Sequence, residues 1–236
     1  YDFVTVSPTV TPLPTHHSYS TLVAHYSFDD GTAADDAVGD GSLDGTITGA
    51  TATTGLFGSG ALAFDGSGDY VEFPTEVTAD IQGSAARTVC LWAVIDSWDL
   101  GALFLYGSSS YNRAFGFMSA TTSGSTRLHF YGTLVVVPLA NSDDGQWHHY
   151  CVAYDGSAWT LYFDGASAQT ATVALDTGSD YAFALGDQVD KYGDYPFDGA
   201  IDEVYVYSSA LDAASIQVLY DFVTVSPTVT PLPTHH

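Results

Sequence analysis

The stretch GLFGSGALAFDGSGDYVEFP, residues 55–74, contains two short apolar runs separated by a turn sequence. Residues 61–64 and 70–73 are rich in strand-forming side chains, whereas DGSGD between them consists of the residues that favour tight turns. The same strand–turn pattern recurs along the chain, for example in AYDGSAW and YFDGASA. We expect strands at residues 22–28, 61–64, 70–73, 88–95, 102–106, 114–118, 127–131, 148–154, 160–163, 183–185 and 201–207.

The only helix that the sequence predicts is short and lies near the C-terminal end, at residues 212–220 (DAASIQVLY). No long helical periodicity is present elsewhere. Many short strands with closely spaced turns are typical of two packed antiparallel sheets. The sequence therefore predicts an all-β sandwich with one short C-terminal helix.

A repeated segment frames this predicted sandwich. Residues 1–17 read YDFVTVSPTVTPLPTHH, and residues 220–236 are identical to them. We interpret the chain as one unit of a tandem array, with a linker at 1–20, the sandwich at 21–220 and the start of the next linker at 221–236, identical to 2–17. The alternative is a single linker sequence that occurs at both ends of one globular unit.

The repeated segment has a β-prone first part, YDFVTV, and a Pro-rich second part, SPTVTPLPT. The prolines favour an extended, semi-rigid linker. Ser-Pro and Thr-Pro steps resemble segments that carry O-linked sugars, although a bare spacer is the alternative. The residues of this predicted glycosylated linker are Ser7, Pro8, Thr9, Thr11, Pro12, Pro14, Thr15, Ser226, Pro227, Thr228, Thr230, Pro231, Pro233 and Thr234.

The charge of the chain is strongly negative. It has 4 Lys and Arg residues against 28 Asp and Glu residues, which gives a formal net charge of −24. So few cations cannot neutralise a phosphate backbone, and an anionic membrane surface would repel the chain, which excludes nucleic acid and membranes as partners. No apolar run approaches the roughly 18 residues needed to cross a bilayer. A divalent cation is a natural counter-charge, but the acids also serve solubility.

Five blocks of sequence resemble, in order and spacing, the laminin-G-like and pentraxin-like (concanavalin A-like lectin/glucanase) jelly-roll domains. Residues 22–50 resemble the opening of such a domain and residues 55–74 its next block. TVCLWAVID, DGQWHHYCVAYDGSAWTLYFDG and FDGAIDEVYVYSSALDAASI resemble the later blocks. The resemblance covers residues 22–220 and implies a jelly roll. It says less about function, because the fold serves lectins, adhesion modules and structural spacers.

The resemblance also implies a disulfide. Cys90 and Cys151, the only cysteines of the chain, match the paired cysteines that join neighbouring strands in this family. Such a bridge requires an oxidising compartment, which implies an extracellular or cell-surface protein. Two buried free thiols are the alternative.

Calcium is the ligand that the resemblance implies most directly, because relatives hold Ca²⁺ at the ends of their loops. ALGDQVDKYGD resembles the pentraxin calcium loop and nominates Asp187, Gln188 and Asp190, with Asn112 as a distant partner. Val189 departs from the pattern, because that loop expects a polar ligand there.

A second calcium region is expected where the first and last strands of the fold lie together. Asp29 and Asp30 of FDD would then meet Asp202 of IDEV. Ca²⁺ needs six to eight oxygen ligands, so several such groups must converge. Each of these acids could instead be a turn former or a solvated surface charge.

Catalysis finds little support in the sequence. His148 and His149 have no accompanying nucleophile pattern, and the Glu-x-Asp-x-Glu motif of the glucanase branch is absent. The sequence therefore predicts a protein that is not an enzyme. Most aromatic residues suit core positions, and Trp98 in IDSWDLG is the best candidate for stacking against a sugar.

Two functions fit these observations. The first is a structural repeat of an extracellular fibre or surface stalk, in which neighbouring copies of the same unit join head to tail through the stiff linker. The alternative is a calcium-dependent glycan-binding module for lectin activity or cell adhesion, displayed in several copies so that avidity adds to affinity. The identity of the repeated segments favours the first function, a structural repeat of a fibre.

Overall fold

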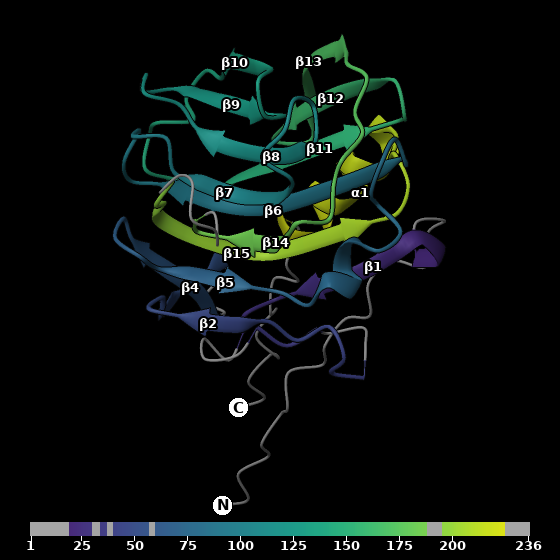
Figure 1. Cartoon of the computed structure of the whole chain (residues 1–236). Coiled ribbons are helices and arrows are strands. Elements are labelled where there is room, and N and C mark those ends of the chain that lie inside the picture. The colour runs from purple at the N-terminus through teal and green to yellow at the C-terminus, as the bar shows by residue number, and fades with distance from the viewer. Residues whose placement is uncertain (1–18, 30–33, 37–39, 57–59, 188–194, 225–236) are drawn as a thin grey trace, which may run out of the picture.

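A computed structural model of the chain describes residues 19–29, 34–36, 40–56, 60–187 and 195–224. Two antiparallel sheets pack face to face, with one helix outside them (Figure 1). The predicted all-β sandwich is thereby confirmed.

The eight-stranded sheet has β15 (Asp198–Tyr207) and β6 (Arg87–Ile95) at its centre. The order across the sheet is β13-β12-β11-β6-β15-β4-β3, and β1 also pairs with β15. β1 thus joins the start of the sandwich to its last strand. The remaining strands are β13 (Ala166–Thr172), β12 (Ala158–Phe163), β11 (His148–Tyr154), β4 (Gly60–Asp65), β3 (Thr51–Thr54) and β1 (Leu22–Tyr26).

The seven-stranded sheet has the order β10-β9-β8-β7-β14-β5-β2. Its first four strands follow one another in the chain as a meander, and three strands from other parts of the sequence complete it. The strands are β10 (Leu134–Pro138), β9 (Ser125–His129), β8 (Ala114–Ser119), β7 (Ala102–Gly107), β14 (Tyr181–Leu185), β5 (Tyr70–Glu72) and β2 (Thr46–Thr48). Two 3₁₀ helices, η1 (Tyr19–Thr21) and η3 (Thr75–Thr78), flank strands.

The main core lies between the two sheets and is rich in aromatic rings. Phe104, Phe117 and Phe183 of the seven-stranded sheet are buried there together with Trp159 of β12. Alternate residues of each strand supply this core, because successive side chains of a strand point to opposite faces. Arg87 is also fully buried, and its guanidinium donates hydrogen bonds to the carbonyl oxygens of residues 81 and 83 and to two hydroxyl groups.

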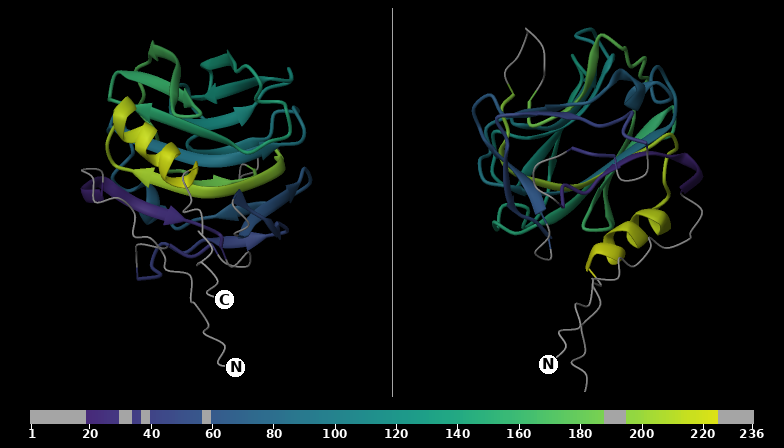
Figure 2. Two further views of the ribbon diagram at one scale, coloured as in Figure 1. Left: turned by 180° about the vertical axis from the view of Figure 1, so that it is seen from behind. Right: turned by 90° about the horizontal axis from the view of Figure 1, so that it is seen from below.

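A second apolar cluster lies outside the eight-stranded sheet, beneath helix α1 (Ala213–Thr224). The helix crosses the outer side of β11, β6 and β15 (Figure 2). Ile216 and Leu219 are buried there against Tyr205 and Tyr207. The eight-stranded sheet is therefore covered on both faces where the helix lies.

The helix extends further than the sequence predicts. It continues to Thr224, beyond the expected end of the sandwich at residue 220. Residues 220–224 are the start of the second YDFVTV copy, so the β-prone interpretation is wrong for this copy. The ring of Tyr220 stacks on Trp92 with centroids 5.5 Å apart, and this packing outweighs the local strand preference. The first copy, at residues 1–6, lies outside the described residues.

The expected strands are all present, with ends that differ by a few residues. Four further strands, β2, β3, β10 and β13, were not expected. β3 and β13 are edge strands whose Thr, Ala and Ser side chains are mostly exposed, so they lack the apolar alternation that predicts a strand. In the described part of the chain, no helix has the length and apolar character to cross a membrane.

The predicted disulfide between Cys90 and Cys151 is confirmed, and it closes a loop with a sequence separation of 61. The two residues are direct partners in the β6–β11 register, with Cα atoms 4.0 Å apart. Both cysteines are fully buried under α1. The bond therefore fastens two central strands of the covered sheet.

We expect the double substitution Cys90→Ala/Cys151→Ala to lower the free energy of unfolding by about 4 kcal/mol, because it restores the entropy of the open loop to the unfolded chain. Chemical denaturation measures this change. Wild-type protein kept reduced should lose a similar amount, which controls for the missing sulfur atoms. An unchanged denaturation midpoint would contradict a stabilising bridge.

Candidate functional site

The outer face of the seven-stranded sheet is crossed by one continuous row of paired residues. The strand registers align Leu134, His129, Gly116, Leu105, Ala184, Glu72 and Thr46, one from each strand in turn. Cross-strand partners point to the same side of a sheet. Their sequence neighbours Leu128, Phe115 and Val71 belong to the main core, so the row lies on the opposite, outward face.

One half of this face carries a group that we call the tyrosine cluster: Arg127, His129, Tyr131 and Tyr195. The His129 ring makes edge contacts with both tyrosines, with centroids 5.9 Å from Tyr131 and 5.7 Å from Tyr195. The two tyrosines pack on an apolar floor made of Ala102, Leu105, Ala114 and Met118. Two half-buried aromatic rings thus lie beside a guanidinium and an imidazole.

Three buried side-chain nitrogens of this cluster have no hydrogen-bond partner among the described residues. His129 is only 4% exposed, yet neither ring nitrogen has a hydrogen-bond partner among the described residues, and the buried Nε of Arg127 has none either. Burial, together with the nearby Arg127 charge, lowers the pKa of His129 to about 4. Burial also lowers the pKa of Arg127. Buried polar groups without partners are rare in native proteins and reduce stability.

Backbone strain accompanies the tyrosine cluster. Tyr131 has a φ of 56°, which is unusual for a bulky residue, and strain of this kind gathers at functional sites. Asn112 holds this conformation, because its backbone N–H donates to the Tyr131 carbonyl oxygen at 2.9 Å and its Oδ1 accepts from Thr133 at 2.7 Å. Tyr111 lies against Gly132, where a Cβ would come within 2.6 Å of its ring. At 71% exposure, Tyr111 adds an accessible ring beside the cluster.

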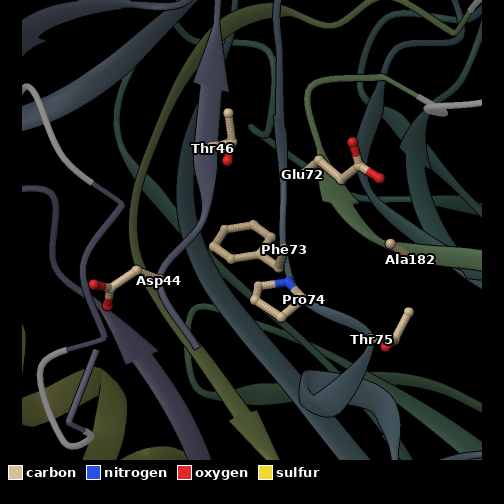
Figure 3. Close-up of a pocket in the computed structure, with 7 residues that line it drawn as sticks. All are labelled: Asp44, Thr46, Glu72, Phe73, Pro74, Thr75 and Ala182. Atoms are coloured by element: carbon tan, nitrogen blue, oxygen red, sulfur yellow. The ribbon is translucent and has the colours of Figure 1, made fainter. Parts of the chain in front are cut away.

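The other half of the face contains a pocket of about 320 Å³ (Figure 3). Its lining residues are Asp44, Thr46, Glu72, Phe73, Pro74, Thr75 and Ala182. The Asp44 and Glu72 carboxylates lie on opposite sides of Phe73 and point away from each other (Figure 3). Asp44 also accepts a hydrogen bond from the backbone of Asp36 at 2.9 Å. The two acids therefore do not converge on a common ligand.

A second candidate site surrounds Asp202 of β15, which is fully buried. Its carboxylate accepts hydrogen bonds from the backbone N–H groups of Leu56 and Glu203, at 2.9 and 2.8 Å. Burial, with smaller contributions from the charges of Glu203 and Asp29, raises the pKa of Asp202 to about 8. Asp202 and Asp29 are thus close enough to interact, as the sequence predicted.

Two glycines let the backbone pack closely against oxygen atoms at this site. A Cβ on Gly60 would lie 2.3 Å from the carbonyl oxygen of Phe28 and 2.5 Å from that of Asp29. A Cβ on Gly55 would lie 2.5 Å from Asp202 Oδ2. Phe28 and Glu203 also have positive φ angles, of 51° and 50°. Converging carboxylate and carbonyl oxygens in a strained backbone fit the donor chemistry of calcium.

The first predicted calcium region is not assembled in the same way. Asp187 is buried and accepts a hydrogen bond from the Tyr195 backbone at 2.7 Å. It follows Gly186, which bonds to the start of β7, whereas Asn112 follows the opposite end of β7. The register therefore separates Asn112 from Asp187, and Asn112 braces Tyr131 instead. Gln188, Asp190 and, from the second region, Asp30 lie outside the described residues.

Trp98, the predicted sugar-stacking residue, is partly buried and packs against the main core, and its role stays a prediction. The predicted glycosylation residues at 7–15 and 226–234 lie outside the described residues. The sequence alone did not predict a role for Arg127, His129, Tyr131, Tyr195 or Tyr111. The run RLHFYG at 127–132, in which basic and aromatic residues follow one another, was a signal for Arg127, His129 and Tyr131, but Tyr111 and Tyr195 lie outside it.

Comparison with protein families now settles the family. The model of the concanavalin A-like lectin/glucanases superfamily matches residues 65–217, more than half of the chain. The chain belongs to this superfamily. No curated protein sequence matches the chain.

Solved structures with the same fold include an arabinanase domain in complex with arabinotriose, the binding domain of a toxin and a sialidase. Domain 4 of AbnA, a GH43 extracellular arabinanase from Geobacillus stearothermophilus in complex with arabinotriose, is 25% identical, with a TM-score of 0.65 over 85% of this chain and 98% of that one. The binding domain of Paraclostridial Mosquitocidal Protein 1 is 12% identical, with a TM-score of 0.66. The match covers 86% of this chain and 52% of that domain, so this chain spans about half of its length. Trypanosoma rangeli sialidase is 14% identical, with a TM-score of 0.66. The match covers 93% of this chain and 36% of the sialidase.

We expect His129→Phe to preserve or raise stability at neutral pH, because it removes two buried nitrogens without partners. In the unfolded chain the histidine titrates near 6.5, so between that pH and about 4 only the unfolded state gains the proton. Wild type should therefore lose roughly 3 kcal/mol through this residue as the pH falls through that range, and the variant should not.

Denaturation at several pH values measures the difference between the two proteins. His148→Phe is the control, because His148 is hydrogen-bonded to Asp164 and Asp144 and its removal should destabilise the domain. Equal acid sensitivity of wild type and His129→Phe would contradict the lowered pKa.

Proposed function

We propose that this domain binds glycans through the outer face of its seven-stranded sheet, at the tyrosine cluster and Tyr111. The observation that carries the proposal is His129, buried between two tyrosine rings without a hydrogen-bond partner among the described residues, beside Arg127, whose buried Nε has none either. Sugar rings present an apolar face that stacks on aromatic side chains and hydroxyl groups that need oriented polar partners. A few placed polar groups in an aromatic setting are typical of such ligand sites.

The structural neighbours support the same function. The arabinanase domain was solved with arabinotriose, and cell entry of botulinum neurotoxin type C, another protein with this fold, is dependent upon interaction with two ganglioside molecules. The toxin structure is 12% identical and this chain spans 51% of it, so it supports the fold alone. None of the neighbours named here is described as a fibre subunit. These likenesses favour glycan binding over the structural repeat of a fibre.

The repeated segment retains a place in this proposal. Identical sequences at residues 1–17 and 220–236 are consistent with several copies of the domain in one chain. Copies joined by Pro-rich linkers would bind a polymeric glycan with avidity, even where each site binds weakly. The disulfide is consistent with an extracellular or cell-surface location, because such bonds persist in oxidising compartments.

Calcium belongs to the proposal as a structural ion at Asp202. The Asp202 carboxylate and the carbonyl oxygens of Phe28 and Asp29 would supply ligands to it. A bound cation would keep Asp202 ionised and join β15 to the segment after β1. This would stabilise the fold that presents the sugar-binding face, without direct contact with the sugar.

A glycan array probed with the whole chain, followed by calorimetry with the glycans that bind and with arabinotriose, tests glycan binding. Tyr111→Ala and Tyr195→Ala should each weaken binding about tenfold or more, because each removes a stacking surface. Tyr70→Ala is the matched control, since Tyr70 lies on β5 at the other side of the same sheet. An array without any bound glycan, or equal losses in all three variants, would overturn the proposal.

Calcium binding is tested by thermal unfolding with EDTA or with millimolar calcium. We expect calcium to raise the Tm of the wild type by several degrees, because it binds only the folded state. Asp202→Asn should abolish this increase, whereas Asp44→Asn, in the divergent acid pair of the pocket, should retain it. The same Tm in EDTA and in calcium would remove calcium from the proposal.

A further inference from the structure

The strands that carry Arg127, His129 and the apolar floor of the tyrosine cluster come from a part of the chain without acidic residues. Residues 100–142 contain none of the 28 Asp and Glu residues, but they contain Arg113 and Arg127, two of the four cations. This stretch supplies β7, β8, β9 and β10 in full. In a chain with a net charge of −24, one half of one sheet is therefore free of negative side chains.

In the described part of the chain, no acidic side chain pairs with Arg127. Among the described residues it forms no salt bridge, whereas Arg113 pairs with Asp176 at 3.6 Å and Arg87 is buried with carbonyl and hydroxyl partners. Burial lowers the pKa of Arg127, and the Tyr195 hydroxyl raises it by a smaller amount. A partly desolvated guanidinium without an acid is unfavourable, and this cost is removed when an anion binds.

The acidic residues on the other half of the same face are too distant to form an ion pair with Arg127. Glu72 lies on β5, four strands from β9 in the sheet order, which corresponds to about 19 Å at the usual strand spacing. At physiological ionic strength, exposed charges are screened beyond about 8 Å. The repulsive field of the distant acids therefore has little influence on an anion at Arg127.

We propose that the glycan bound at the tyrosine cluster is acidic, and that Arg127 binds its carboxylate while Tyr131 and Tyr195 contact the sugar ring. This inference rests on the proposed glycan-binding function and specifies its ligand class. The planar guanidinium matches a carboxylate with two parallel hydrogen bonds, which a compact ammonium group does not. His129 stays neutral beneath the tyrosines because its pKa is low, so Arg127 supplies the charge. Leu134 and Val136, exposed on the adjacent β10, extend the apolar side of the surface.

The test compares ligands that differ only in charge. Wild type is titrated with glycans from the array that carry uronic or sialic acid, and with the methyl esters of the same glycans, which retain the ring but lose the charge. We expect the acids to bind about 10- to 100-fold more tightly than their esters. Arg127→Met should reduce binding of the acid to the level of the ester, and should not alter binding of the ester.

Two further variants separate the binding role from folding. Arg127→Lys should restore only part of the preference for the acid, because it keeps the charge but not the planar fork. Arg113→Met is the matched control, as Arg113 is already paired with Asp176, and it should bind like wild type. The Tm of each variant shows that it is folded, and Arg127→Met should be at least as stable as wild type because it removes an unpaired cation.

The outcomes distinguish this inference from the function on which it rests. Equal binding of acids and esters, or a preference for neutral or sulfated glycans, would overturn the carboxylate assignment and leave glycan binding intact. An Arg127→Met variant that keeps the wild-type preference would also overturn it. Absence of binding to every glycan class would overturn both proposals.

Discussion

Helix α1 makes the outer faces of the two sheets different, because it packs against only one of them. A sheet in a two-layer sandwich has one face in the core, and its second face must be either covered or polar. Here α1 covers the second face of the eight-stranded sheet, where Tyr220 stacks on Trp92 and Ile216 is buried over the disulfide. The corresponding face of the seven-stranded sheet has no helix against it in the described part of the chain. The outer face of the seven-stranded sheet is the surface on which we propose that a ligand binds.

The distribution of charge follows the same division. Acidic residues occupy the turns and the β5 side, where Asp44 and Glu72 line the pocket, and they are absent from residues 100–142. A uniform acidic coat would keep the domain soluble but would repel acidic glycans from every surface. Because β7 to β10 follow one another in the chain, one acid-free stretch of sequence becomes one continuous half of a sheet. The absence of acidic residues from one stretch of sequence thereby becomes the absence of acidic side chains from one half of the sheet.

The sequence predicted the parts of this structure that depend on local patterns and on chain order. The apolar run at residues 148–154 became β11 with the expected bounds, and Asp202 lies near Asp29 because β1 pairs with β15. The polar edge strands β3 and β13 escaped prediction, since their pairing is imposed by neighbours rather than by their own apolar pattern. The tyrosine cluster could not be predicted, because it depends on the register that places β9 beside β8 and on a turn that turns Tyr131 outward.

Strain and unsatisfied polarity at the tyrosine cluster argue that this surface is maintained for something other than stability. A positive φ at Tyr131 costs about 1 kcal/mol or more, and each buried polar atom without a partner costs a similar amount. Polar substitutes for Tyr131 or apolar substitutes for His129 would remove these costs, yet the chain retains both residues together with an unpaired Arg127. An anionic ligand would compensate the cost at Arg127 by supplying the missing counter-charge. The same logic applies to Asp202, whose buried carboxylate is unfavourable without a proton or a cation.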